Sequence, residues 1–230
     1  MLIRWPDVHG GGFVTGNPSI DDRFCFDFAN DNKILVVSLD YPKAPAHPFP
    51  APSEALVDAV KAVLADQSLP FDRKKVAIGG FSAGANLAIA VSQDQSMQGK
   101  LRGLISFYGP LDFSITNAEK LARRPADSGP DPLEMNAPAF EWAYVKADQD
   151  LTDPLLSVAL ASKEKLPPKL YIIGCELDML CRESEMMAGQ LAREGTGEMI
   201  PSDVIWERNG VKWEKILGEE HGKMIFKILL

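Results

Sequence analysis

A serine in a glycine-rich turn is the residue of this sequence best suited to covalent chemistry. Ser82 is at the centre of GFSAG, residues 80–84, which ends the short apolar run 76–80 and precedes a helix-forming run. A tight turn from strand to helix holds such a serine in a strained backbone conformation, and the glycines let neighbouring segments approach it. The start of the following helix favours negative charge. The pattern therefore predicts a serine nucleophile for acyl transfer.

A second glycine-rich segment could stabilise the charge that acyl transfer produces. It reads HGGGF at residues 9–13, well before Ser82 in the chain. Consecutive glycines expose backbone N–H groups, which can point at a carbonyl oxygen as it becomes an oxyanion. Either motif alone could be an ordinary glycine-rich turn, but the two in this order favour an oxyanion hole that serves Ser82.

The general base is found by elimination among the three histidines of the chain. His9 belongs to the glycine-rich segment, and His47 lies between prolines in HPFP, where we expect it to order a loop. His221 follows the last strand-like run, in EEHG, and the chain order serine, acid, histidine places the base there. We therefore expect His221 to activate Ser82.

The acid that orients the base should follow a strand between Ser82 and His221. The loop after the run 169–174 offers two carboxylates, Asp178 and Glu176. Three aspartates further upstream are weaker candidates: Asp148, Asp150 and Asp153. The pattern alone leaves the choice among them open.

The elements that must position these residues are short buried strands that alternate with helices. Strands are expected at residues 34–39, 76–80, 101–109 and 169–174, and helices at 54–66, after Ser82 and at 183–194. Residues 204–217 hold an Asn-Gly turn between two alternating runs, which predicts a hairpin. Alternating strands and helices pair in parallel with right-handed crossovers. The predicted fold class is α/β, with a mostly parallel, doubly wound sheet in a single domain over residues 1–230.

Composition excludes several classes of function. Because the net charge is −8 and no basic stripe is present, nucleic acid is not an expected partner. No run approaches the roughly 18 apolar residues of a membrane-spanning helix, and the N-terminus lacks the layout of a secretory signal. The three cysteines form no disulfide framework, although Cys175 and Cys181 could pair, and with Cys25 they are expected as free thiols. We therefore expect a cytoplasmic protein, and the motifs require neither a metal nor another cofactor.

Several stretches of the chain together resemble one family. They are HGGGF, LDYPKAPAHPFPAPSEAL, GGFSAGANLAIA, YGPLD, DPLLS, LPPKLYIIGCELDMLCRESEMMAGQLAREG and EEHG, and they follow one another across nearly the whole chain. In this order they resemble the hormone-sensitive-lipase-like carboxylesterases of the α/β-hydrolase superfamily, the group that includes arylacetamide deacetylase. The resemblance implies an α/β-hydrolase fold.

The resemblance also implies roles for individual residues. Asp178, ahead of Glu176, matches the acid of the family's catalytic triad, and Gly11, Gly12 and Ala83 match its oxyanion-hole amides. The implied reaction is hydrolysis of a small-molecule carboxylic ester through an acyl-enzyme. Two alternatives are kept: a non-catalytic or weakly active ligand-binding member of the fold, and an arylformamidase or amide deacetylase that uses the same residues.

The chain departs from the family at the serine turn and at both ends. Phe81 replaces the usual acidic residue beside the nucleophile, which bears on substrate preference. Only eight residues precede His9 and nine follow His221. We therefore expect the N-terminal cap and first strands of the family to be lacking, with residues 112–154 as the remaining cap.

Three further expectations follow from these ends. Pro6 should interrupt the strand that leads into the glycine-rich segment, and a sheet edge at residues 2–8 should stay unpaired. The apolar run 225–230 should lack a covering helix, so the chain is expected to dimerise or aggregate. A poorly enclosed site removes little apolar surface from water, so short acyl groups are expected to be preferred.

Overall fold

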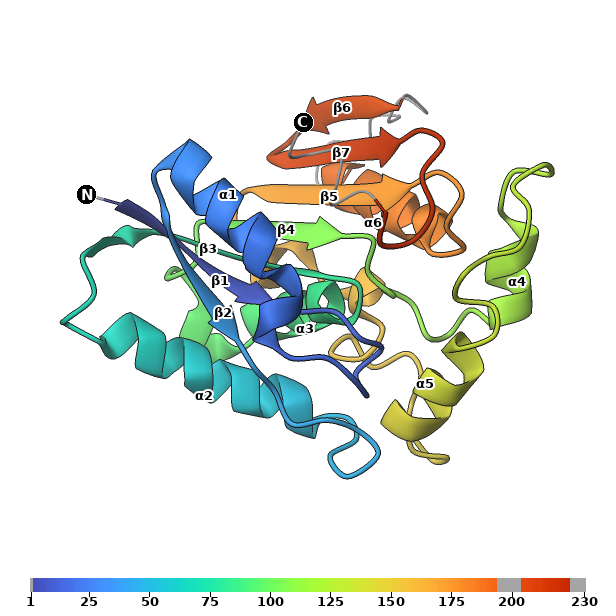
Figure 1. Ribbon diagram of the computed structural model, residues 1–230, viewed down its shortest axis with the longest axis horizontal. Helices are drawn as coiled ribbons and strands as arrows, with labels where there is room; N and C mark the ends of the chain where they lie inside the picture. Colours follow the sequence, from blue (N-terminus) through green and yellow to red (C-terminus); the bar gives the residue numbers. More distant parts are fainter. Residues whose placement is uncertain (1, 194–203, 224–230) are drawn as a thin grey trace.

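One sheet of seven strands runs through the part of the chain that this computed structural model describes, residues 2–193 and 204–223 (Figure 1). The strands lie in the order β2-β1-β3-β4-β5-β7-β6. Their bounds are β1 (Leu2–Val8), β2 (Leu35–Leu39), β3 (Phe71–Phe81), β4 (Gly103–Phe107), β5 (Leu170–Cys175), β6 (Ile205–Arg208) and β7 (Val211–Ile216). Every neighbouring pair is parallel except β6 and β7, which are antiparallel.

Helices cover both faces of this sheet. The α-helices are α1 (Asp22–Asn32), α2 (Ala51–Ala65), α3 (Ala83–Ser92), α4 (Asn117–Ala122), α5 (Ala137–Tyr144) and α6 (Cys181–Arg193), with short 3₁₀ turns η1 (Pro18–Asp21), η2 (Gln95–Met97), η3 (Val158–Leu160) and η4 (Lys163–Lys165). Leu56 of α2, Leu87 of α3 and Leu191 of α6 belong to the larger core cluster. Phe24 of α1 belongs to a second cluster, where its ring meets that of Phe107 on the other face of the sheet. The sheet is therefore packed between two apolar layers, one on each face.

The predicted α/β fold is confirmed, with its mostly parallel sheet. The hairpin expected from the Asn-Gly turn is present as β6 and β7. Asn209 and Gly210 take φ angles of 51° and 79°, the positive values that suit a two-residue hairpin turn. The long segment at residues 112–154 carries α4 and α5, which lie beyond the carboxyl ends of the parallel strands (Figure 1).

The expectation about the first strand is wrong. β1 continues through Pro6 and is an interior strand, paired with β2 on one side and with β3 on the other. Because a strand residue directs its N–H toward a single neighbour, one proline removes one hydrogen bond and leaves the rest of the ladder intact. An edge of the sheet is formed by β2 instead. The apolar run 225–230 lies outside the described residues.

Candidate active site

The turn that holds Ser82 connects β3 to α3 and is strained. Ser82 has φ 52° and ψ −121°, a conformation that non-glycine residues rarely adopt. Its amide donates to the carbonyl of Phe107, at 2.9 Å. The flanking glycines are required by space, because a Cβ atom would lie 2.4 Å from the carbonyl oxygen of Val8 at Gly80, and 1.9 Å from it at Gly84. The backbone of β1 therefore packs directly against the turn.

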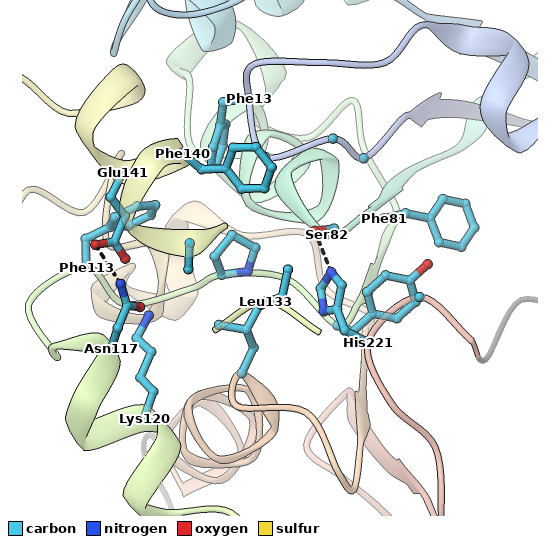
Figure 2. Close-up of a pocket in the computed structure, with 18 of the residues that line it drawn as sticks. Phe13, Phe81, Ser82, Phe113, Asn117, Lys120, Leu133, Phe140, Glu141 and His221 are labelled. Atoms are coloured by element: carbon cyan, nitrogen blue, oxygen red, sulfur yellow. Dashed lines mark hydrogen bonds between the residues drawn. The ribbon is translucent and has the colours of Figure 1, made fainter. Parts of the chain in front are cut away.

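Three side chains that the sequence singles out meet in one hydrogen-bonded series. The Ser82 Oγ lies 2.9 Å from Nε2 of His221 (Figure 2). Nδ1 of His221 lies 2.7 Å from Oδ2 of Asp178. The Asp178 side chain is fully buried, and its second oxygen accepts a hydrogen bond from the amide of Leu180 at 2.9 Å. The ring of Tyr108 packs edge-on against the imidazole, with centroids 4.9 Å apart. This geometry is the one that a serine nucleophile, a general base and an orienting carboxylate require.

The other acid and base candidates lie elsewhere. The Glu176 carboxylate accepts a hydrogen bond from the amide of Gly218 at 2.8 Å, so it holds the loop that leads to His221. Asp150 and Asp153 accept hydrogen bonds within their own loop, from residues two positions further on. Asp148 and His47 are exposed at the surface.

The glycine-rich segment brings free amide groups to the same place. A Cβ atom at Gly10 would lie 3.3 Å from the Cβ of Ser82, so the segment touches the serine. Gly11 and Gly12, at φ 118° and 60°, line the cavity beside it. Within residues 2–193 and 204–223, no acceptor takes the N–H groups of Gly11, Gly12 or Ala83. These amides can therefore donate to a ligand oxygen.

Asp40 and Tyr41, which the sequence reasoning missed, hold the glycine-rich segment in place. The side chain of buried His9 lies 3.1 Å from Asp40 through Nε2 and 2.6 Å from the Gly10 carbonyl through Nδ1. Its ring stacks on Tyr41, whose hydroxyl donates to the His9 carbonyl at 3.2 Å. Although burial opposes it, hydrogen bonds from Lys43 and His9 hold the pKa of the Asp40 carboxyl at about 2. Asp40 and Tyr41 directly follow β2, and this position at the carboxyl end of a parallel strand is the signal that could have found them.

The cavity above Ser82 has a volume of about 340 Å³, and its walls are largely apolar. Phe140 and Leu133 lie along it between Ser82 and a polar group formed by Asn117, Lys120 and Glu141 (Figure 2). A Cβ atom on Gly12 would lie 2.4 Å from the Phe140 ring, so α5 closes tightly over the glycine-rich segment.

The polar group is held by two contacts. Asn117 donates from Nδ2 to Oε2 of Glu141 at 3.0 Å, which joins α4 to α5. Lys120 forms a buried ion pair of 2.8 Å with Glu183, which joins α4 to α6. Burial raises the pKa of the Glu141 carboxyl, against the charge of Lys120 and the hydrogen bond from Asn117. Sequence reasoning missed this group, because charged residues on a short helix usually face water.

Residues 112–154 also contact the loop that carries Asp178. Arg124 pairs with Asp131 at 3.2 Å and donates to the carbonyl of Leu177 at 2.8 Å. Asp131 also accepts from the amide of Met179 at 2.8 Å. The 112–154 segment thus forms hydrogen bonds with the backbone on both sides of Asp178, which helps to keep the carboxylate directed toward His221.

Two features are absent from the described residues. Residues 2–193 and 204–223 contain no group of three or more histidine, cysteine or acidic side chains arranged to hold a metal ion. No helix in the same ranges has the length and apolar character needed to cross a membrane. All three cysteines are buried free thiols.

Comparison with known proteins identifies the family. Residues 7–200 match a family model described as the alpha/beta hydrolase fold. An esterase from Acinetobacter venetianus is 32% identical over 170 residues, which cover 73% of this chain and 54% of that protein. The chain therefore spans about half the length of that curated relative.

Solved structures agree with this match. An ester hydrolase from the metagenome of Lake Arreo, in complex with a derivative of bipyridine phosphonate, superposes with a TM-score of 0.82 at 29% identity, over 100% of this chain and 69% of that one. A hormone-sensitive lipase from a metagenome library shares the fold, with a TM-score of 0.78 at 23% identity, over 99% of this chain and 71% of that one. The chain belongs to the α/β-hydrolase family, as the resemblance implied.

Proposed function

We propose that this chain hydrolyses carboxylic esters through an acyl-enzyme formed on Ser82. The observation that supports the proposal most directly is the series Ser82, His221 and Asp178, joined at 2.9 Å and 2.7 Å beside a cavity. The names of its relatives, esterase and ester hydrolase, agree with this activity.

In the proposed reaction His221 removes the Ser82 proton as Oγ attacks the ester carbonyl carbon. The buried Asp178 carboxylate holds the imidazole in the required tautomer and stabilises the imidazolium. The tetrahedral intermediate then collapses, the bond to the alcohol oxygen breaks, and His221 returns the proton to the departing alcohol. His221 then deprotonates a water molecule, whose oxygen attacks the acyl carbon. The bond to Ser82 Oγ breaks, His221 returns the proton to Oγ, and the carboxylic acid leaves.

The oxyanion of the intermediate is assigned to the amides of Gly11, Gly12 and Ala83. Their N–H groups have no acceptor within the described part of the chain. Loss of one such donor typically lowers kcat by about 10²–10³. The contacts of the buried His9 with Asp40 and Tyr41 keep the two glycine amides in position before the substrate arrives.

We further propose that residues 112–154 act as a cap and that the site prefers short acyl groups. Because His221 protonates the departing alcohol, the acyl group must extend away from it, past Phe140 toward the polar group of Asn117, Lys120 and Glu141 (Figure 2). An apolar chain that reached this group would remove its water without offering a hydrogen bond, at a cost of about 1–3 kcal/mol per polar group. Acetate and butyrate esters should therefore have higher kcat/KM values than octanoate and laurate esters.

The activity itself is tested with p-nitrophenyl butyrate. The wild-type chain should release p-nitrophenol, and Ser82→Ala should lose several orders of magnitude in kcat while it stays folded by circular dichroism. Ser92→Ala is a matched control, because Ser92 is a buried serine at the end of α3 that does not line the cavity and whose hydroxyl donates to the Ile89 carbonyl. Equal rates for Ser82→Ala and wild type would refute the proposal. A folded wild-type chain that binds esters without turnover would favour a ligand-binding role.

Self-association and a cytoplasmic location stay predictions. β2 forms one edge of the sheet, and the cap carries three exposed large apolar side chains, Met135, Trp142 and Leu151. Such surfaces favour association between copies. Light scattering over a range of concentrations would measure it, and a monomer throughout that range would contradict the prediction.

A further inference from the structure

A carboxylate without a partner lies in the wall of the cavity that contains Ser82. Asp21 ends η1 immediately before α1, and only 2% of the residue is exposed. Among residues 2–193 and 204–223, no group donates a hydrogen bond to its side chain, and no lysine, arginine or histidine forms an ion pair with it. The side chain nevertheless lines the cavity.

Such an arrangement is costly unless a ligand completes it. A buried carboxylate normally has hydrogen-bond donors or a cation beside it, since removing its water without compensation costs several kcal/mol. Burial, followed by the nearby charge of Asp22, raises the pKa of the Asp21 carboxyl to about 6. It is therefore ionised under mildly alkaline conditions. The group it lacks is a donor or a positive charge.

The surroundings of Asp21 favour an organic cation over a hydrated one. Ile20, Phe81 and Tyr108 line the same cavity, so apolar and aromatic groups are available to the carbon atoms of a ligand. Ammonium groups that carry methyl or methylene substituents suit a carboxylate beside aromatic rings.

The position of His221 indicates which part of an ester would meet this wall. The Tyr108 ring lies against the imidazole, with centroids 4.9 Å apart. Since the imidazole returns its proton to the departing alcohol, the alcohol must lie on the side of Ser82 where His221 and Tyr108 are. Phe81 lies on the opposite side of Ser82 from Asn117, Lys120 and Glu141 (Figure 2).

We propose that Asp21 binds an ammonium group carried by the alcohol part of the ester, so that esters of amino alcohols are the substrate class of this site. The proposal rests on the proposed ester hydrolysis. In it, Asp21 is a binding residue that forms an ion pair with the substrate and exchanges no proton with the reacting atoms.

The test compares butyrylcholine with 3,3-dimethylbutyl butyrate, two esters of nearly the same shape that differ in the charge of the alcohol. The wild-type chain should prefer the cationic ester in kcat/KM by about tenfold or more, which corresponds to about 1.4 kcal/mol. The trimethylammonium group has no N–H to donate, so this preference comes from the attraction between its charge and the carboxylate. Asp21→Asn should abolish most of this preference. Asp7→Asn is the matched control: Asp7 is an equally buried carboxyl, but it does not line the cavity, so this variant should keep the wild-type ratio.

A second measurement needs no variant. Choline should inhibit the hydrolysis of p-nitrophenyl butyrate by the wild-type chain more strongly than 3,3-dimethylbutan-1-ol does. If p-nitrophenyl butyrate is hydrolysed but neither the ester ratio nor the inhibition favours the cation, the role of Asp21 is refuted while the esterase proposal stands. If p-nitrophenyl butyrate is not hydrolysed at all, the proposed function fails first.

Discussion

Replacing Asp178 by asparagine should nearly abolish activity, because no orientation of the new amide can satisfy its two neighbours. In the native site Oδ2 accepts from Nδ1 of His221 at 2.7 Å, and Oδ1 accepts from the Leu180 amide at 2.9 Å. An asparagine has one acceptor oxygen, so its NH₂ group must face either the Leu180 N–H or Nδ1 of His221. If the NH₂ group faces Nδ1 of His221, the imidazole keeps its proton on Nε2, and that proton then points at Ser82.

The size of the loss follows from this tautomer. A histidine with its proton on the wrong nitrogen cannot accept the serine proton, and the equivalent change in a serine protease lowers kcat by about 10⁴. That factor corresponds to roughly 5 kcal/mol of transition-state stabilisation. We expect a loss of this order for Asp178→Asn, with KM changed much less, since the carboxylate does not touch the substrate.

Glu176→Gln is the matched control for this prediction. Glu176 is on the same loop, and its carboxylate accepts a hydrogen bond from the Gly218 amide at 2.8 Å. A glutamine oxygen can accept the same hydrogen bond, so the loss should stay within about tenfold. Initial rates on p-nitrophenyl butyrate, with circular dichroism to check folding, measure both variants. A larger loss in Glu176→Gln than in Asp178→Asn would refute the assignment of the acid.

Three other predictions concern cooperation, pH and chain length. The double variant Asp178→Asn/His221→Ala should cost little more in kcat than the worse single variant, because members of a triad act as a unit, whereas additive losses would contradict this. Burial and the charge of Asp21 raise the pKa of Asp7 from 3.8 to about 8, against a hydrogen bond from Cys25. The folded chain therefore binds this proton more tightly than the unfolded chain, and the free energy of unfolding should fall as pH rises from about 4 toward 8. Urea unfolding at about pH 5 and about pH 8 should show this fall in the wild type and a smaller one in Asp7→Asn. Finally, Asn117→Leu/Glu141→Leu should raise kcat/KM for p-nitrophenyl octanoate relative to the butyrate, and an unchanged ratio would show that the polar group does not limit chain length.

The sheet could be predicted from sequence where strands are short, apolar and bounded by turns. β2, β4 and β5 are such runs, whereas only the apolar second half of β3 could be predicted, because residues 72–75 are charged. The Asn-Gly pair fixes the turn between β6 and β7. The first strand could not be predicted in this way, because a proline argues against an interior strand unless the pairing of each residue is known. α1 also gave little signal, since charged and amide residues interrupt the aromatic residues that it buries.

The site could be predicted to the extent that each residue belongs to a local motif. Ser82 and the glycine-rich segment are recognisable from spacing alone, and His221 from elimination. The choice between Asp178 and Glu176 needed the family resemblance, because both lie on the loop after β5. Asp21 and Lys120 could not be found, since their importance comes from burial and from neighbours distant in sequence.

Labelling with a fluorophosphonate probe tests directly whether Ser82 is an activated nucleophile. The probe reacts with a serine only if a neighbouring base activates it, so it reports on Ser82, His221 and Asp178 together. We expect one covalent adduct on the peptide that contains Ser82, the same adduct in Ser92→Ala, and none in Ser82→Ala. A folded wild-type chain that stays unlabelled, or a Ser82→Ala variant that is labelled as well as the wild type, would contradict it.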